Sequence, residues 1–142
     1  MPHNLLRVQL MSPEGVEYEG EAESVLVTTE AGQVEIFPGH TNFVSPIAYS
    51  KTLIKNGQTA QEFYVRHGLV TVDQFANTVS IMGFACQKVS DIRYESLLEY
   101  HATVLEQLQS RESLSALQVQ FLEDQATSVE QLVEVVRPVE KE

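Results

Sequence analysis

The sequence predicts an α+β fold: an N-terminal antiparallel β-sandwich, with the character of a flattened barrel, followed by a C-terminal two-helix antiparallel hairpin. Composition changes near Val89, because all 7 glycines, four of the 5 prolines and most aromatic residues precede it. The first part alternates apolar and polar residues with the period of a strand, whereas the second repeats apolar residues at helical spacing. We therefore expect two domains, residues 1–88 for the sandwich and residues 89–142 for the helices.

Short segments with strand character fill the first part. In the first of them, Leu6, Val8 and Leu10 occupy every second position, which is the pattern of a half-buried strand. The predicted strands cover residues 5–11, 16–19, 22–29, 33–37, 51–55, 62–66, 69–72 and 78–83. Asn56-Gly57 gives the strongest hairpin signal, since a type I′ turn needs positive φ at both central residues. Seven or eight strands at this spacing are typical of a sandwich or flattened barrel.

The second part has the pattern of two amphipathic helices. Ser90 is positioned to cap the first helix, whose apolar or large residues recur three or four positions apart. Those residues are Tyr94, Leu97, Leu98, His101, Leu105 and Leu108. A polar run over 110–113 interrupts the pattern, which resumes at Leu114, Leu117, Phe121, Val129, Leu132 and Val136 and ends before Pro138. Each apolar stripe needs a partner; the simplest is the other helix, and the alternative is another protein.

Charge excludes several classes of partner. The chain carries 9 Lys and Arg against 20 Asp and Glu, a net charge of −11. Such a surface repels phosphate backbones and anionic headgroups, so we expect no nucleic-acid partner and no direct binding to a membrane surface. We expect no signal peptide, because the start of the sequence lacks a basic region followed by an apolar one, and no run reaches the roughly 18 apolar residues of a membrane span. The single Cys86, in an apolar stretch, is expected to be buried and reduced.

Motifs that carry chemistry are missing from the sequence. The histidines His3, His40, His67 and His101 lack the spacing of a metal site, and we expect His101 to be a core histidine of the helical stripe. Neither a phosphate-binding glycine motif nor a nucleophile elbow occurs. We therefore expect no catalytic residue, no metal and no cofactor, and a protein that is not an enzyme in its own right.

One segment stands out, residues 30–40 with the sequence Glu-Ala-Gly-Gln-Val-Glu-Ile-Phe-Pro-Gly-His. A hairpin with Gly32 at its tip leads into an apolar pair and a Pro-Gly turn that presents His40. Local turn chemistry alone would explain these residues. An exposed tip and a rigid turn are also good docking features.

With this segment the chain resembles the epsilon subunit of F-type ATP synthases, which is called delta in mitochondria. The pattern of that family is Gly-Glu-hydrophobic-Gly-Ile-hydrophobic-Pro-Gly-His, and this chain carries Gly32, Ile36, Pro38, Gly39 and His40 in register. Residues 12–14, 20–25 and 67–70 also match, and a two-helix tail starts near residue 90. The order of the two domains and a length of 142 residues agree with the family.

The resemblance implies a non-catalytic central-stalk (rotor) subunit that couples the gamma subunit to the c-ring of a proton- or sodium-translocating ATP synthase. Such a subunit lies on the cytoplasmic side of the bacterial inner membrane and meets the membrane only through the complex. Carried over by position, Ser12 and the turn Phe37, Pro38, Gly39 and His40 would face gamma or the c-ring, and the tip Glu30, Ala31, Gly32 and Gln33 would touch the c-ring.

The tail departs from the family. In some members it binds ATP or contacts the alpha and beta subunits to inhibit ATP hydrolysis. At the start of the tail, this chain has Ser90 where the ATP-associated pattern of the family has Asp, and Tyr94 where that pattern has Ala. Arg93 is therefore the one candidate nucleotide-binding residue. Residues 89–142 hold 4 basic and 11 acidic side chains, which disfavours an inhibitory contact with an acidic turn of beta. Glu35 stands where the family usually has Gly.

Two other functions compete with the rotor subunit. The first is a free-standing adaptor that binds a partner helix with its helical stripe. The second is a small β-sandwich enzyme or sugar-binding module, which would need a concave pocket with convergent polar groups.

Overall fold

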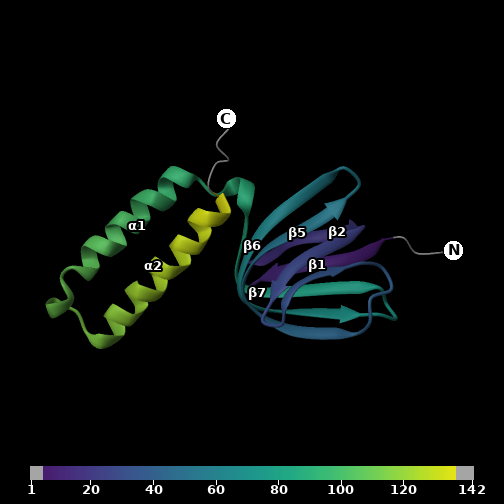
Figure 1. Ribbon diagram of the computed structural model, residues 1–142, viewed down its shortest axis with the longest axis horizontal. Coiled ribbons are helices and arrows are strands. Elements are labelled where there is room, and N and C mark those ends of the chain that lie inside the picture. The colour runs from purple at the N-terminus through teal and green to yellow at the C-terminus, as the bar shows by residue number, and fades with distance from the viewer. Residues whose placement is uncertain (1–4, 137–142) are drawn as a thin grey trace. The chain divides into compact units, whose positions relative to one another are not determined.

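The computed structural model describes residues 5–136 of the chain, so Pro138 and His3 lie outside the described residues. Within that range one sheet precedes two helices, which confirms the predicted α+β class (Figure 1). The chain divides into two compact units, with the division after Val89. We call them the sheet unit and the helical unit. Neither helix of the described range is long and apolar enough to cross a membrane.

The sheet unit contains seven strands among the described residues. They are β1 (Leu6–Ser12), β2 (Gly15–Ala22), β3 (Ser24–Thr29), β4 (Gly32–Ile36), β5 (Phe43–Asn56), β6 (Thr59–Asp73) and β7 (Thr78–Lys88). Their order across the sheet is β2-β1-β7-β6-β5-β3-β4. Strands β1 and β7 pair in parallel, and the other neighbours pair antiparallel.

Long strands turn this single sheet into two layers. The start of β5 pairs with the end of β6, next to β7 and β1, whereas the end of β5 pairs with β3. Strand β5 begins at Phe43, so the predicted start at residue 51 is wrong. Pro46 cannot donate a ladder hydrogen bond, but the pairing of β5 with β3 covers only its last part, so Pro46 lies on an edge segment where a proline is tolerated.

The two strands predicted at 62–66 and 69–72 are a single strand, β6. Ladder pairing of β6 with both neighbours skips His67, which has a φ of +54°. A Cβ on Gly68 would clash with the backbone oxygen of Met82, and one on Gly83 would lie 2.7 Å from Val65 Cγ1. The two glycines therefore allow β6 and β7 to approach closely at this point.

Alternating side chains of the strands form the core of the sheet unit. Leu6, Val8 and Leu10 are fully buried, which confirms the period-2 prediction for the first strand. The remaining core is aliphatic apart from Phe63 and Cys86, with Tyr18 packed at its margin. At the free energy of about 1.5–3 kcal/mol for each large apolar side chain buried, this core is the main source of stability of the unit.

The helical unit consists of α1 (Tyr94–Leu108) and α2 (Ala116–Val136), joined by a short 3-10 turn at Arg111–Ser113. The predicted interruption at 110–113 is confirmed. The predicted start near Ser90 is wrong, because a 3-10 turn occupies Val89–Asp91 and extended backbone at Arg93 precedes α1. At the start of α2, Ser115 Oγ accepts the Gln118 N–H and Gln118 Oε1 accepts the Ser115 N–H, a capping box.

The contact between the helices is displaced from the predicted stripes, because Val104 and Ala126 belonged to neither of them. Val104, Leu108 and Ala126 form its buried centre, and Val119 and Leu122 pack against them. Predicted stripe members Leu98, Leu105, Leu117 and Phe121 are exposed instead. A stripe of apolar residues at helical spacing is wider than the line along which two helices touch, so its outer members remain uncovered.

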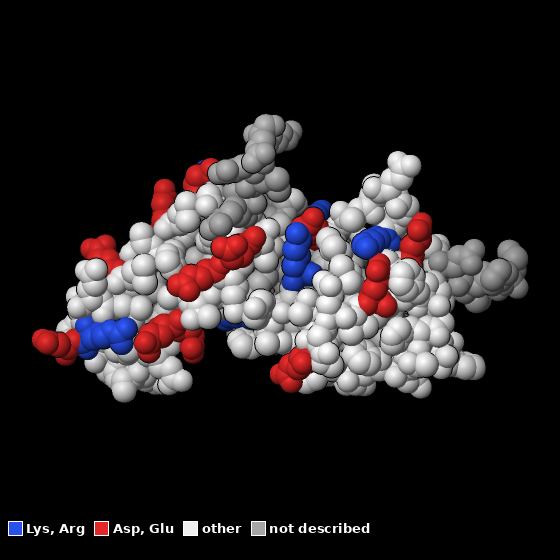
Figure 2. Space-filling model, viewed as in Figure 1, with Lys and Arg blue, Asp and Glu red and all other residues white. Residues whose placement is uncertain are grey.

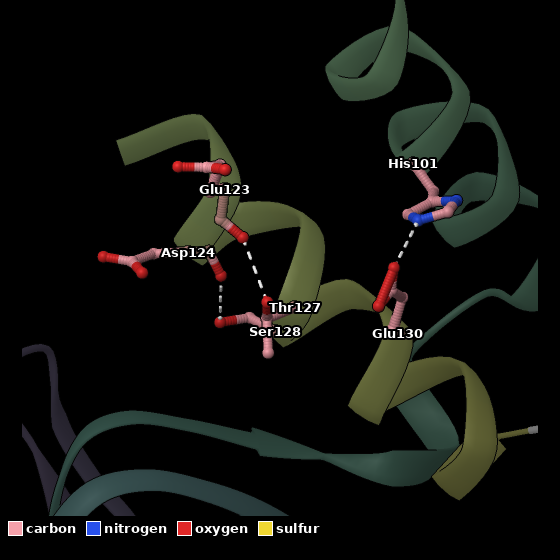
Figure 3. Close-up of polar contacts among 6 residues, drawn as sticks. All are labelled: His101, Glu123, Asp124, Thr127, Ser128 and Glu130. Carbon is pink, nitrogen blue, oxygen red and sulfur yellow. Dashed lines mark hydrogen bonds and ion pairs between the residues drawn. The ribbon is translucent and has the colours of Figure 1, made fainter. Parts of the chain in front are cut away.

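Polar contacts also join α1 to α2, and others lie within α2 (Figure 3). His101 Nε2 lies 3.3 Å from Glu130 Oε1, and the Tyr100 hydroxyl donates to Gln125 Oε1 at 3.2 Å. On α2, Thr127 and Ser128 donate to backbone carbonyls one turn earlier in the same helix. His101 is therefore partly exposed and bonded across the hairpin, not a core residue as predicted.

Candidate docking surface of the sheet unit

The turn between β3 and β4 holds the predicted tip, and its shape is fixed by local hydrogen bonds. Thr29 Oγ1 accepts the Ala31 N–H at 3.1 Å and donates to the Gly32 carbonyl at 2.9 Å. Gly32 has a φ of +114°, which favours glycine. The Glu30 N–H donates to the Pro46 carbonyl of β5 at 3.2 Å. Glu30, Ala31, Gly32 and Gln33 are all exposed on this preorganised tip.

The second predicted turn, from Phe37 to His40, follows β4 and is fastened to the connection between β6 and β7. The His40 N–H donates to the Phe37 carbonyl at 3.1 Å, and Gly39 takes a φ of +86°. Asn77 Oδ1 accepts the Gly39 N–H at 2.9 Å, while Gln74 Nε2 donates to the Gly39 carbonyl at 3.2 Å. Pro38 is half-buried and Phe37 is exposed.

His40 takes part in the structure of its own turn. Its Nδ1 lies 2.7 Å from the Thr41 carbonyl, and because a carbonyl only accepts, Nδ1 carries the proton. The ring also meets Phe43 edge-on, with 5.9 Å between ring centroids. These contacts fix the imidazole, and a contact of His40 with another protein stays a prediction.

Ser12 ends β1 and closes the turn to β2. Its Oγ accepts the Glu14 N–H at 3.2 Å and donates to Glu17 Oε1 at 3.3 Å. Ser12 is half-buried, so its hydroxyl is partly available at this end of the sheet.

A row of apolar side chains joins the Ser12 turn to the Glu30 tip across the outside of the sheet. The cross-strand pairs are Val16 with Met11, Met11 with Met82, Met82 with Leu69 and Leu69 with Pro46. Residues paired across strands lie on one face of a sheet, so these five residues form a continuous line over β2, β1, β7, β6 and β5. We call this line the outer apolar row.

The outer apolar row is open to solvent. Met82 is 57% and Val16 is 54% exposed, and Leu69 and Pro46 are also exposed. Two exposed neighbours on the same strands widen the row, Phe84 beside Met82 and Val44 beside Pro46. Contiguous exposed apolar surface of this kind marks interaction sites in soluble proteins.

The structure brings some of the predicted residues together and separates others. Ser12 follows Met11 in sequence, and Glu30 bonds to Pro46, so they lie at the two ends of the outer apolar row. The turn from Phe37 to His40 lies at the other end of β4 from Gly32. The predicted partner-binding residues thus belong to two regions of the sheet unit.

Glu35 lies beside a depression of about 670 Å³ in the sheet unit. The residues that line it are Leu5, Glu23, Ser24, Glu35, Phe37, Pro38, Lys55 and Gly57. Its carboxylates already have partners: Glu35 Oε2 accepts from Lys55 Nζ at 3.0 Å and from Ser24 Oγ at 3.1 Å, and Glu23 accepts the Gly57 N–H. The hydrogen bond from Lys55, and then that from Ser24, lowers the pKa of Glu35. Polar groups engaged with one another in this way do not converge on a ligand.

The other residues considered for chemistry, Cys86 and Arg93, do not lie in this depression. Burial raises the pKa of the Cys86 thiol to about 12, which keeps it protonated and unreactive at neutral pH. Arg93 is exposed directly before α1, and its contact with a nucleotide stays a prediction. Among residues 5–136, no group of three or more His, Cys, Asp or Glu is arranged to hold a metal ion.

The outer apolar row was not predicted from the sequence, although one signal for it was present. In the segment 78–83, apolar residues occupy both strand faces, as Ile81 and Met82 show. Alternation identifies one buried face of a strand, but an apolar residue on the opposite face suggests a second covered surface.

Comparisons with known proteins agree with this architecture. The family model described as "ATP synthase, Delta/Epsilon chain, beta-sandwich domain" matches residues 5–85. The ATP synthase epsilon chain of Halalkalibacterium halodurans is 33% identical over 90 residues, which span 63% of this chain and 66% of that one, slightly less than two thirds of its length. The ATP synthase epsilon chain of Bacillus thuringiensis is 27% identical over 106 residues, 75% of this chain and 78% of the relative.

Solved structures with the same fold come from ATP synthases. One is a chain from the Euglena gracilis mitochondrial ATP synthase with OSCP, F1 and c-ring, with a TM-score of 0.67 at 13% identity over 91% of this chain and 82% of that one. Another comes from the central stalk and c-ring of the Tetrahymena thermophila mitochondrial enzyme, with a TM-score of 0.54 at 12% identity over 92% and 96% of the two chains. At such identities the likeness concerns the fold alone.

Proposed function

The chain belongs to the ATP synthase delta/epsilon chain family, and from this membership we propose that it is a non-catalytic rotor subunit coupling the gamma subunit to the c-ring of a proton- or sodium-translocating ATP synthase. Its curated relatives are ATP synthase epsilon chains. In this proposal the chain is peripheral to the bacterial inner membrane, on the cytoplasmic side, and reaches it only through the complex.

The outer apolar row carries this proposal. Strands fix the backbone of its residues, so little backbone entropy is lost when a partner covers them. A rotor subunit must transmit torque without slipping, and an apolar face on a fixed backbone suits that task better than a flexible loop. We assign the row to gamma.

The preorganised tip at Glu30 and Ala31 is the second contact. Its exposed residues are polar or small, and its backbone is fixed by Thr29 and by the bond to Pro46. We assign this tip, together with the Ser12 turn at the far end of the row, to the polar loops of the c-ring or to the adjoining surface of gamma. The tip and the Ser12 turn adjoin the two ends of the outer apolar row.

Inhibition through the tail is not part of the proposal. From Tyr94 to Val136 the helical unit carries eight acidic side chains and one basic side chain, Arg111. An acidic turn of the beta subunit would be repelled by this surface. We expect the tail to lack an electrostatic inhibitory contact of that kind.

Co-purification tests the proposal. The full chain is mixed with gamma and the catalytic hexamer from the same source, and stoichiometric co-elution in size exclusion is expected. Met82→Glu places a charge in the centre of the outer apolar row and should weaken the affinity for gamma by at least about tenfold, about 1.4 kcal/mol. The control is Leu117→Glu, an exposed apolar residue of α2, which should co-elute normally.

Two results would overturn the assignment. If the folded chain does not co-elute, the free-standing adaptor becomes the better function. If Leu117→Glu abolishes co-elution and Met82→Glu does not, gamma binds the helical unit and the outer apolar row has another role.

A further inference from the structure

A groove opens at the end of the helical unit where α1 passes into α2. Its volume is about 590 Å³, and its lining residues are Gln107, Ser110, Leu114, Leu117, Gln118, Phe121 and Leu122. Leu117 and Phe121 lie one turn apart on α2 and are 78% and 59% exposed. We call this feature the tip groove.

Hydrogen bonds on both sides of the connection fix the backbone beside the tip groove. The capping box of Ser115 and Gln118 fixes the first turn of α2, and Ser113 Oγ donates to the Ser110 carbonyl at 2.8 Å. Arg111 lies 3.5 Å from Glu123 Oε2, which ties the connection to α2. The groove is thus formed before a partner arrives, which lowers the entropic cost of binding.

Negative charge surrounds the apolar lining. Arg111 is the one basic residue between Tyr94 and Val136, and Glu123 already pairs with it. On α1, Glu106 directly precedes the lining residue Gln107, and by helical spacing Asp124 lies one turn after Phe121 on α2. Figure 2 shows that acidic side chains predominate over the two helices on the face in view.

We propose that the tip groove binds an amphipathic helix of a protein partner, which inserts two apolar side chains one turn apart and places Lys or Arg on either side of them. The spacing of Leu117 and Phe121 on α2 matches the i, i+4 spacing of such anchors. The flanking carboxylates select the basic partner. This binding goes beyond the rotor function and does not depend on the outer apolar row.

Charge also argues against two other occupants. A second copy of this helical unit would bring two acidic surfaces together, and an anionic lipid surface would meet the same repulsion. A basic helix instead gains attraction over distances of about 10 Å at moderate salt, so its binding should weaken as salt is raised.

Binding of synthetic peptides to the full chain tests this inference. The probe is an alanine-based helical peptide with Leu at i and i+4 flanked by Lys, compared with the same peptide flanked by Glu and with one that has Ala in place of both Leu. Fluorescence anisotropy should show saturable binding of the Lys-flanked peptide, at least about tenfold tighter than either comparison peptide.

Variants locate the binding on the chain. Leu117→Glu and Phe121→Ala should each weaken the Lys-flanked peptide by at least about tenfold. Met82 lies in the sheet unit, so Met82→Glu should leave the affinity for the Lys-flanked peptide unchanged. Leu117 and Phe121 are exposed, so circular dichroism is expected to show unchanged helix content in both variants.

Several outcomes would overturn the inference. The Lys-flanked peptide could fail to saturate, bind no better than the Glu-flanked peptide, or bind Leu117→Glu as tightly as the unaltered chain. Sedimentation that shows a dimer of the unaltered chain, lost in Leu117→Glu, would identify a second copy as the occupant instead.

Discussion

Glu35 shows at the residue scale what the sequence could and could not predict. The sequence identified it as a departure from the family pattern, but the direction of its side chain depends on residues far along the chain. The register of β3 with β4 and with β5 brings Ser24 and Lys55 to its carboxylate. Such partners cannot be read from local pattern, because they follow from strand pairing.

Substitution of Glu35 should make stability respond differently to pH. The Lys55 hydrogen bond, followed by the one from Ser24, lowers the pKa of Glu35 in the folded chain. A carboxyl with a lowered folded pKa contributes stability above its unfolded pKa and loses it as pH falls through the folded pKa. Glu35→Gln should therefore lower the free energy of unfolding at pH 7, and the deficit should shrink as the solution is acidified below about pH 4.

Urea unfolding of the unaltered chain and of Glu35→Gln, at pH 7 and at pH 3, measures this effect. Lys55→Met serves as the matched variant, because it removes the same hydrogen bond from the other side. The double variant should lose little more than either single variant. An equal deficit at pH 7 and at pH 3 would show that the pairing does not contribute through the charge of Glu35.

Strand β6 illustrates the same division at the scale of an element. The residue pair His67-Gly68 resembles a turn, so the sequence predicted two strands where the structure has one. Positive φ at His67 and the close approach at Gly68 keep the chain in the sheet while pairing skips one residue. Local propensity indicated the irregularity correctly but could not tell a turn from a bend within a strand.

A methyl group at this bend should destabilise the sheet unit. Gly68→Ala would push a Cβ into the backbone of β7 at Met82, and the cost of relieving such an overlap is about 1–3 kcal/mol. Gly20→Ala is the control, since its Cβ would have its nearest neighbour at 3.4 Å, in ordinary contact with Tyr18. Chemical denaturation should show a change of less than about 0.5 kcal/mol for the control. Equal effects of the two substitutions would mean that β6 and β7 can separate without cost.

The sequence predicted that two helices form, but it did not predict which residues lie between them. Both stripes and the interruption between them follow from spacing alone, and the predicted end of the second helix before Pro138 lies outside the described residues. The buried centre at Val104 and Ala126 was missed, because helical periodicity defines a broad face and the partner helix chooses the line of contact. Which members of the stripes are exposed could therefore be determined only from the structure of the helix pair.

At the scale of the whole molecule, the order of sheet and helices was predictable from composition, whereas the candidate docking surface was only half predictable. The turns at Ser12 and Glu30 were identified by their residue types. The outer apolar row between them is assembled from five strands whose order across the sheet differs from their order in sequence. No local window of sequence contains it.

Removal of the helical unit should leave the sheet unit folded. Every member of its buried core lies between Leu6 and Cys86, so a chain that ends at Lys88 keeps the whole core. Thermal unfolding followed by circular dichroism should remain a single cooperative transition. A broad, non-cooperative melt of the shortened chain would show that the helices contribute to the stability of the sheet and that the proposed boundary between domains is misplaced.

The parallel pairing of β1 with β7 has a consequence for synthesis on the ribosome. Arg7 pairs with Thr78, so the first strand of the sheet unit lies beside the last strand of the unit to be made. The hairpin of β1 and β2 emerges early with the apolar side chains of Leu6, Val8 and Leu10 uncovered, and contacts of such long sequence separation form slowly. The interval before β7 emerges is therefore when a nascent chain of this topology most needs protection from aggregation.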